Sequence, residues 1–135
     1  GVDDYYIGKK KFIEELDIAV SQVNEEYFTV LLSHRPEIIE LYSEYNFDLV
    51  LSGHAHGGQW RVPVILEHGL VTPDIKFLPK FTTGKRILNN TTQIVSRGLS
   101  KFTPPFPRIF NFPEIIVVDI IPEWNNWHFP YIMRK

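Results

Sequence analysis

One stretch of the chain decides the fold: FTVLLSHRPEIIELYSEYNFDLVLSGHAH, residues 28–56. It begins with a short apolar run, residues 28–32, and carries a second at residues 48–52, both of the kind that forms strands buried on both faces. Between them, Pro36 suits a first helical turn, apolar residues recur at helical spacing, and Asn46 suits a helix end. Strand, helix and strand in this order predict a βαβ unit with parallel strands and a right-handed crossover.

The segments on either side predict another helix and a β-rich C-terminal part. Residues 9–23 place their apolar side chains on one helical face. Beyond Trp60, prolines and glycines separate short β-rich runs at residues 93–96 and 115–121, a pattern typical of antiparallel strands joined by irregular loops. Residues 69–90 show no clear periodicity, and we expect them to form a long surface loop.

The composition indicates one globular domain. Of the 135 residues, 44% are hydrophobic and 14% are aromatic, which is enough apolar material for a core. The 14 basic residues nearly balance the 16 acidic ones, so a net charge of -2 argues against nucleic acid as a partner. The lack of cysteine excludes disulfides and thiol chemistry. No apolar run approaches the roughly 18 residues that span a bilayer, and we expect no signal peptide.

Three of the five histidines follow the two apolar strands of the βαβ unit. His34 comes just after the first strand, and Gly53-His54-Ala55-His56 comes just after the second. Because parallel strands end at the same edge of a sheet, these side chains are expected to lie where ligands gather in open α/β sheets. Neutral imidazole is the commonest side-chain metal ligand, and the flanking glycines permit a tight turn. The pattern therefore favours a metal site.

Each of these residues could instead have a purely structural role. The strand-end histidines could instead satisfy loop carbonyls, and His68 and His128 are expected to be structural because they lack the strand-end context. Four arginines could clamp an anionic substrate or could form surface salt bridges: Arg35, Arg61, Arg97 and Arg108.

Two segments, LLSHRP at residues 31–36 and LVLSGHAHGGQ at residues 49–59, resemble the calcineurin-like metallophosphoesterases. The extended form Gly-His-x-His-Gly-Gly-Gln, with Arg-Val-Pro close behind it, is similar to the bacterial YkuE/YaeI-like branch. Later segments fit as well: VSRGL at residues 95–99, PR at residues 107–108 and PEII at residues 113–116. The similarity covers roughly residues 1–121.

The resemblance implies an α/β fold. We expect the C-terminal half of an α/β/β/α sandwich, in which the βαβ unit is followed by mostly antiparallel strands. Residues 1–123 would form the C-terminal part of the phosphoesterase domain, and residues 124–135 would form an aromatic tail or an edge strand.

The resemblance also implies a site for two divalent metal ions. His34 and His54 match ligands of the second ion, and His56 matches a ligand of the first. A ligand set of nitrogens and carboxylates without thiolates suits Mn, Fe, Zn, Ni or Co. The implied activity is hydrolysis of phosphodiesters or phosphomonoesters by a water that two metal ions activate. The substrate would be a small phosphate ester or a phospholipid-like molecule.

The departures from the family pattern matter as much as the matches. The chain lacks the Asp-x-His motif, the Gly-Asp pair with the bridging aspartate, and the Gly-Asn-His motif with the general acid. We therefore expect it to be the C-terminal half of a longer enzyme, to carry no catalytic residue of its own and to be inactive alone. Its natural partner would be the missing N-terminal half, and an exposed apolar face would favour self-association.

Two other hypotheses remain open. The chain could be a non-catalytic binding or scaffold module that keeps the phosphoesterase fold, or an isolated β-rich domain with structural histidines. The resemblance leaves the location open between the cytoplasm and a membrane reached through an N-terminal segment.

Overall fold

The computed structural model describes residues 5, 8–24, 26–100, 102–103 and 106–122. Its elements, in chain order, are α1 (Lys9–Val20), β1 (Val30–Leu32), the 3-10 turn η2 (Pro36–Ile38), α2 (Ile39–Ser43), β2 (Leu49–Ser52), the 3-10 turn η3 (His56–Gly58), β3 (Gly84–Leu88), β4 (Thr91–Val95), β5 (Phe102–Thr103) and β6 (Phe106–Pro107). The expected C-terminal tail, residues 124–135, lies outside the described residues.

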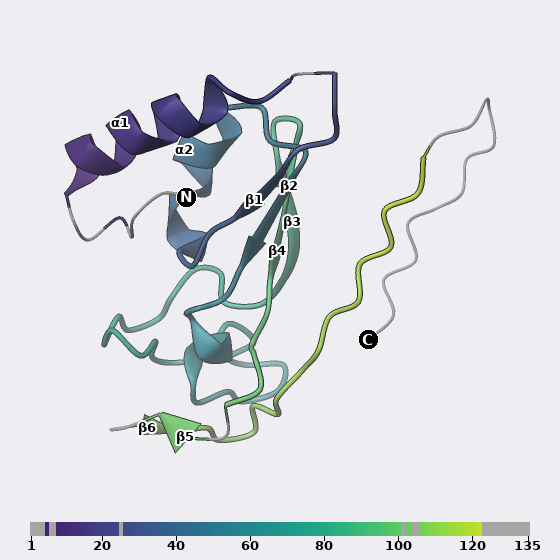
Figure 1. Cartoon of the computed structure of the whole chain (residues 1–135). Coiled ribbons are helices and arrows are strands. Elements are labelled where there is room, and N and C mark those ends of the chain that lie inside the picture. Colours follow the sequence, from purple (N-terminus) through teal and green to yellow (C-terminus); the bar gives the residue numbers. More distant parts are fainter. Residues whose placement is uncertain (1–4, 6–7, 25, 101, 104–105, 123–135) are drawn as a thin grey trace.

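The predicted βαβ unit is confirmed. β1 and β2 are parallel, with Leu32 opposite Leu51, and α2 lies on the connection between them. β4 continues the sheet parallel to β2, and β3 closes it antiparallel to β4, so the strand order is β1-β2-β4-β3. β5 and β6 form a separate antiparallel pair. The chain is thus a mixed α/β structure, in which α1 and α2 lie on the same side of the sheet (Figure 1).

The hydrophobic core lies between the two helices and the sheet. The helical spacing in residues 9–23 places buried Phe12 and Leu16 on one face of α1. The core cluster consists of Phe12, Leu16, Ile39, Tyr42, Phe47 and Val50. This packing holds β1, α2 and β2 together, and therefore positions the loops that follow the two strands.

A buried glutamine connects β4 to the 3-10 turn η2, which precedes α2. The side chain of Gln93 is fully buried, and its amide donates hydrogen bonds to the carbonyl of Pro36 and to the hydroxyl of Ser52, each over 3.1 Å. Arg86 Nε donates to the side-chain oxygen of Gln93, Oε1, over 2.7 Å, and Arg86 Nη2 donates to the backbone carbonyl of Pro36. Because a buried amide must be hydrogen-bonded, this network fixes the turn beyond His34 against the sheet.

β1 differs from its predicted environment. Its apolar run predicts burial on both faces, but the side chains of Val30 and Leu32 are 42% and 76% exposed. The physical reason is its place at the edge of the described sheet, where the helices cover one face and no described strand pairs with the outer edge. The sequence of β1 is that of a strand covered on both faces, but in the described part of the chain the helices cover only one face.

Two predictions for the C-terminal part are wrong. Residues 115–121 form no strand in the described part of the chain, where Val117 alone is in a β-bridge, and Ile115 is 69% exposed. They run on the side of the sheet opposite to the helices (Figure 1). The supposed loop at residues 69–90 contains β3. A β-rich run becomes a strand only where a neighbouring strand accepts its hydrogen bonds, which a short sequence window does not reveal.

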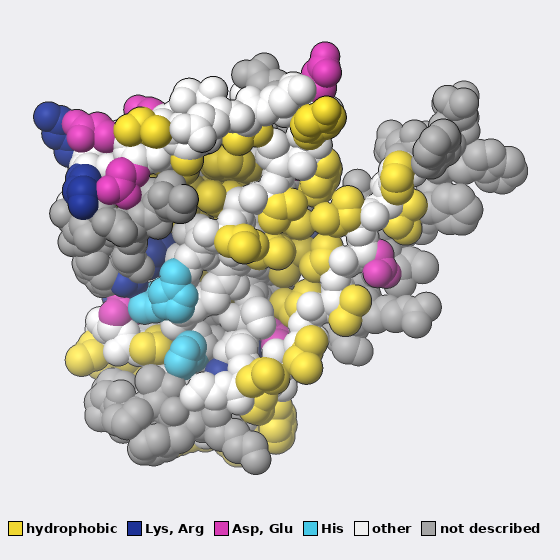
Figure 2. Space-filling view, in the orientation of Figure 1, with side chains coloured by type: hydrophobic (Ala, Val, Ile, Leu, Met, Phe, Trp, Pro, Cys, Tyr) yellow, Lys and Arg dark blue, Asp and Glu magenta, His cyan; other side chains and the backbone are white. Residues whose placement is uncertain are grey.

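Large hydrophobic side chains remain exposed at several places. They include Leu32 of β1, Ile87 of β3, and Phe112, Ile115 and Val117 of the C-terminal segment. Figure 2 shows hydrophobic side chains across the middle of the visible face and along this segment. None of the described helices has the length and apolar character that crossing a bilayer requires.

Candidate metal centre

Two of the three predicted histidine ligands meet at the carboxyl edge of the sheet. His34 and His54 each lie two residues beyond the end of a strand, β1 and β2 respectively. The parallel register brings these ends together, so that His34 Nε2 and His54 Nδ1 lie 3.1 Å apart. The rings meet edge to face, with their centroids 4.8 Å apart. Histidine side chains are visible on one face of the molecule (Figure 2).

The two rings are close enough for one metal ion to bind both. Two nitrogens bound at about 2.1 Å lie about 3.0–3.4 Å apart for bond angles of about 90–110°. The observed separation of 3.1 Å falls in this range, and it is also the length of a hydrogen bond between the two rings. The donor set also fits, because neutral imidazole nitrogens carry the lone pairs that borderline divalent ions accept.

Hydrogen bonds of Tyr42 hold the turn that carries His34. The Tyr42 ring is fully buried in α2, and its hydroxyl forms a short hydrogen bond with Ser33 and donates to the carbonyl of Arg35 over 3.2 Å. Residues on both sides of His34 are therefore fixed to the core, which limits the positions that its imidazole can reach.

His56 lies close to the pair but does not complete a three-ligand cluster. Its pKa is lowered, first by burial and then by the charge of Arg108, with smaller effects from His54 and His34. In the part of the chain that the structure describes, no three His, Asp or Glu side chains converge as a metal site. His54 and His56 have positive φ angles of 62° and 47°. Non-glycine residues rarely adopt this conformation, and such strain concentrates at functional sites.

The glycines after His56 are required by close packing as well as by the turn. Gly57 and Gly58 have φ angles of 63° and 71°. A Cβ at Gly57 would lie 2.5 Å from Asn111 Oδ1, and one at Gly58 would lie 2.2 Å from the carbonyl oxygen of His68. Only glycine allows the histidine turn to pack this tightly against the segments behind it.

The other nitrogen of His54 faces charged residues. Arg35 Nη1 donates to His54 Nε2 over 2.6 Å, and Asp74 Oδ1 lies 3.6 Å from the same nitrogen. Burial, followed by the Arg35 charge, lowers the pKa of His54. Arg35 is only 8% exposed, so its contacts are not those of a surface salt bridge. The described geometry gives Arg35 a direct contact with the histidine pair.

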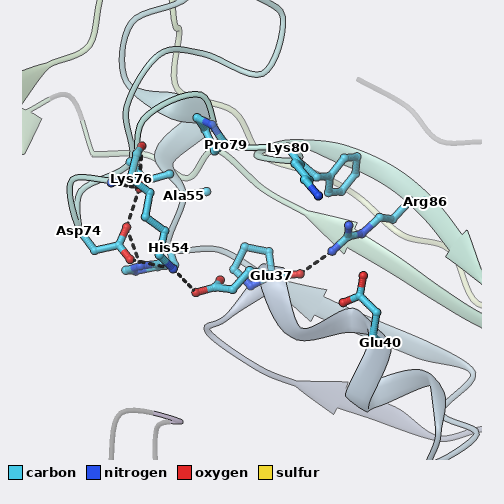
Figure 3. A pocket seen from close by; sticks show the side chains of 12 residues that line it. Glu37, Glu40, His54, Ala55, Asp74, Lys76, Pro79, Lys80 and Arg86 are labelled. Carbon is cyan, nitrogen blue, oxygen red and sulfur yellow. Dashed lines mark hydrogen bonds and ion pairs between the residues drawn. The ribbon is translucent and has the colours of Figure 1, made fainter.

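A cavity of about 250 Å³ opens beside this group. Figure 3 shows Asp74, Lys76 and Glu37 on the His54 side of the cavity, with Glu40, Lys80 and Arg86 farther along. The wall therefore carries charges of both signs. The guanidinium of Arg86 lies over the ring of Phe81, 4.5 Å from its centroid, which adds an aromatic surface.

Comparison with known proteins identifies the family. The chain is 32% identical over 128 residues to an uncharacterized metallophosphoesterase of Aquifex aeolicus, which covers 93% of this chain and 46% of that protein. It is 31% identical over 117 residues to the uncharacterized metallophosphoesterase YkuE of Bacillus subtilis, covering 86% and 37%. The chain is a relative of the bacterial metallophosphoesterases. The resemblance drawn from the histidine motifs is thus confirmed.

Another relative has a substrate in its name. The chain is 33% identical over 103 residues to the UDP-2,3-diacylglucosamine pyrophosphatase LpxG of Chlamydia muridarum, covering 70% of this chain and 29% of that protein. The chain thus spans less than half the length of these relatives. No family model and no solved structure matches it.

The remaining three arginines gather around one carboxylate. Arg97 donates to Glu114 Oε2 from Nε over 2.8 Å and from Nη2 over 2.5 Å. Burial alone would raise the pKa of Glu114, but its hydrogen bonds with Arg97 outweigh this effect and lower it. Burial, followed by the charge of Arg97, lowers the pKa of both Arg61 and Arg108. Glu114 therefore pairs with Arg97, and its charge acts more weakly on Arg61 and Arg108.

Arg61 and Arg108 retain unused donors. Nη1 of Arg61, and Nε and Nη1 of Arg108, are buried without a hydrogen-bond partner among the described residues. The Nη2 group of Arg108 bonds the carbonyl of Arg97. A buried guanidinium with unpaired donors is costly unless an acceptor binds. Arg61 and Arg108 therefore differ from Arg35 and Arg97, whose guanidinium groups have partners among the described residues.

Sequence reasoning missed two residues of the site. Asp74 lies in the stretch without periodicity, where no local pattern distinguishes a functional carboxylate from a solvated one. Asn111 donates to the carbonyls of His56 and Gln59 over 2.6 Å and 3.2 Å, and so fixes the histidine turn from the C-terminal segment. Its distance of 55 residues from His56 leaves no local signal.

Proposed function

We propose that the chain supplies His34, His54 and His56 to the site of a metal-dependent phosphoesterase that binds two divalent ions. The observation that carries this proposal is the 3.1 Å separation between His34 Nε2 and His54 Nδ1 at the carboxyl ends of two parallel strands. His34 and His54 would hold one ion, and His56 would hold the other. Similarity to metallophosphoesterases supports divalent metal use in general.

The residues of this chain hold and orient the reacting groups. Divalent ions would supply a Lewis acid for the phosphoryl oxygens and an activated water. The contacts of Tyr42 with Ser33 and Arg35 hold the turn that carries His34. The lowered pKa of His54 and of His56 keeps their imidazoles neutral at physiological pH. Nitrogen ligands without thiolates suit Mn, Fe, Zn, Ni or Co.

We infer that the substrate is a phosphate ester, either a phosphodiester or a phosphomonoester. Arg61 and Arg108 would contact its phosphate, because their buried N–H groups lack acceptors. Arg35 and Arg97 already contact His54 and Glu114 in the metal-free protein, which makes them the weaker candidates for a phosphate contact. The name of the relative LpxG includes a diacyl group, which supports a lipid-like substrate as one form of this class.

The chain alone is expected to be inactive. Neutral imidazoles do not compensate the charge of two nearby cations, and the bridging carboxylate of the family has no counterpart in this sequence. With these three histidines as the only ligands, binding of one ion should therefore be weak, and binding of two ions should not be stable.

Isothermal titration with Mn²⁺ and Zn²⁺ tests the metal site. The wild type and a control variant, His68→Ala, should bind alike, because His68 is a histidine outside the site that packs near Phe81. A variant with His34, His54 and His56 all changed to alanine should lose the binding. Equal binding by all three proteins would refute the site and would favour the scaffold or structural-histidine hypotheses.

An activity assay tests the expected inactivity. The chain is incubated with Mn²⁺ and either p-nitrophenyl phosphate or bis-p-nitrophenyl phosphate. We expect no hydrolysis above that of the metal in buffer. Metal-dependent hydrolysis that disappears in the triple-alanine variant would show that the chain carries a complete site.

A further inference from the structure

Two groups of opposite charge compete for the same nitrogen of His54. Arg35 Nη1 lies 2.6 Å from His54 Nε2, and Asp74 Oδ1 lies 3.6 Å from it. The ring is held between these residues on one side and His34 on the other, and its side chain is 14% exposed. Which of the two groups bonds Nε2 decides which ring nitrogen carries the proton.

The contact with Arg35 selects one tautomer. A guanidinium only donates, so Nε2 must accept, and in a neutral imidazole the proton then lies on Nδ1. That N–H points at His34 Nε2, 3.1 Å away, and forms a hydrogen bond between the two rings. In this tautomer Nδ1 has no lone pair for a metal ion.

Metal binding through Nδ1 requires the opposite tautomer. Nε2 must then carry the proton and donate it to an acceptor, which at metal-ligating histidines is commonly a carboxylate or a carbonyl. Asp74 is the carboxylate that lies against this nitrogen in Figure 3. It needs to approach by less than 1 Å to reach about 2.8 Å, a usual hydrogen-bond length.

Asp74 is held in place by two neighbouring side chains. Thr72 donates to its Oδ1 over 2.5 Å, and the ammonium of Lys76 lies 3.1 Å from its Oδ2. Both contacts orient the carboxylate, and the ammonium compensates its negative charge. An oriented carboxylate of this kind is a suitable acceptor for an imidazole N–H.

Arg35 has other carboxylates to pair with when it leaves Nε2. Its Nη1 lies 3.8 Å from Asp74 Oδ2 and 3.9 Å from Glu37 Oε1. Glu37 is also bonded to Lys76 over 2.9 Å, so the acidic groups and the two cations form one connected cluster. A small shift of Arg35 within this cluster exchanges its partner without leaving its charge unpaired.

We propose that Asp74 is a positioning residue that holds His54 in the tautomer with a free lone pair on Nδ1, whereas Arg35 holds the other tautomer in the metal-free protein. The part of the proposal that concerns metal rests on the proposed function. The part that concerns the metal-free tautomer does not, so the two can fail separately.

Imidazole nitrogens observed by long-range ¹H–¹⁵N NMR distinguish the two tautomers. In the metal-free wild type, His54 should carry its proton on Nδ1. In metal-free Arg35→Met, the donor is gone, and the proton should move to Nε2, where Asp74 accepts it. A proton on Nε2 in the wild type, or on Nδ1 in Arg35→Met, would overturn the proposal.

Titration with Mn²⁺ provides a second test that does not depend on Arg35. Asp74→Asn keeps the size of the side chain but removes its charge, and its Mn²⁺ affinity should fall about 10-fold to 100-fold, as for other partners of metal-ligating histidines. The matched control is Glu40→Gln, which removes a carboxylate from the same cavity and should stay within about twofold of the wild type.

The outcomes separate the two proposals. If the triple-histidine variant loses Mn²⁺ binding but Asp74→Asn binds like Glu40→Gln, Asp74 has no positioning role and this proposal is wrong. If the triple-histidine variant binds Mn²⁺ like the wild type, the proposed metal site is refuted. The tautomers of metal-free wild type and Arg35→Met then test the role of Arg35 in the metal-free protein.

Discussion

Gly58, which follows the histidine turn, packs closely against the backbone of His68 and Gly69, and this contact predicts the effect of a substitution. Its φ angle is 71°, and a Cβ would lie 2.2 Å from the carbonyl oxygen of His68 and 2.7 Å from Gly69 Cα. Both neighbours are backbone atoms, so no side chain can move aside. The Gly58 carbonyl also accepts hydrogen bonds from Leu70 and Val71, over 3.0 Å and 3.2 Å, which tie the two segments together.

The expected cost of Gly58→Ala has two parts. A left-handed conformation costs an L-residue about 1–2 kcal/mol. Forcing a methyl group into a closely packed contact costs about 1–3 kcal/mol more. The free energy of unfolding should therefore fall by about 2–5 kcal/mol, a large part of the about 5–15 kcal/mol that stabilises a typical domain.

Two matched variants separate these parts. Gly98 has a φ of 70° but no heavy atom within 4 Å of an added Cβ, so Gly98→Ala should lose only the conformational cost, about 1–2 kcal/mol. Gly53 has neither a left-handed φ nor a neighbour within 4 Å, so Gly53→Ala should leave stability unchanged or raise it by up to about 1 kcal/mol.

Urea unfolding followed by tryptophan fluorescence gives the three differences in free energy. The expected order of stability is Gly53→Ala, then Gly98→Ala, then Gly58→Ala. If Gly58→Ala were no less stable than Gly98→Ala, the turn would not pack against the segment at Gly69. Close packing against this segment would then not be the reason why a glycine is required at position 58.

Other predictions concern pH, metal binding and association. The lowered pKa of Glu114 means that its ion pair with Arg97 contributes stability that is present above about pH 4.3, the unfolded value, and is lost as the pH falls through the lower folded value. Wild type should therefore lose more free energy of unfolding on acidification than Glu114→Gln; equal losses would contradict the pairing. Because burial lowers the pKa values of His54 and His56, Mn²⁺ affinity measured by titration calorimetry should decline below about pH 6.5, not above it. Leu32 is 76% exposed on β1, so Leu32→Ser should reduce any self-association seen by sedimentation; unchanged association would place the contact elsewhere.

The βαβ unit and the position of the histidines could be predicted because both follow from local rules. Apolar runs of strand length on either side of an amphipathic segment favour a parallel pair, and the ends of parallel strands share an edge. His34 and His54 are each placed by the strand directly before them, so their meeting needed no information from distant segments.

β1 and residues 115–121 show where such rules stop. Their composition predicts strands that are covered or paired, but coverage and pairing depend on what lies beside them in space. Leu32 and Ile115 are exposed because no described element packs over them. β3 could not be predicted for the same reason. It lies in a stretch without clear periodicity, and it forms a strand by pairing with β4.

The sequence by itself determined the local elements, the edge at which the candidate site lies and the two histidines that meet there, because each depends on residues close together in the chain. Only the tertiary structure decided the partners of those histidines. Asp74 reaches His54, and Asn111 reaches the turn at His56, through contacts between segments that are far apart in sequence. Such contacts depend on how the whole chain packs, and the charge and tautomer of the site depend on them in turn.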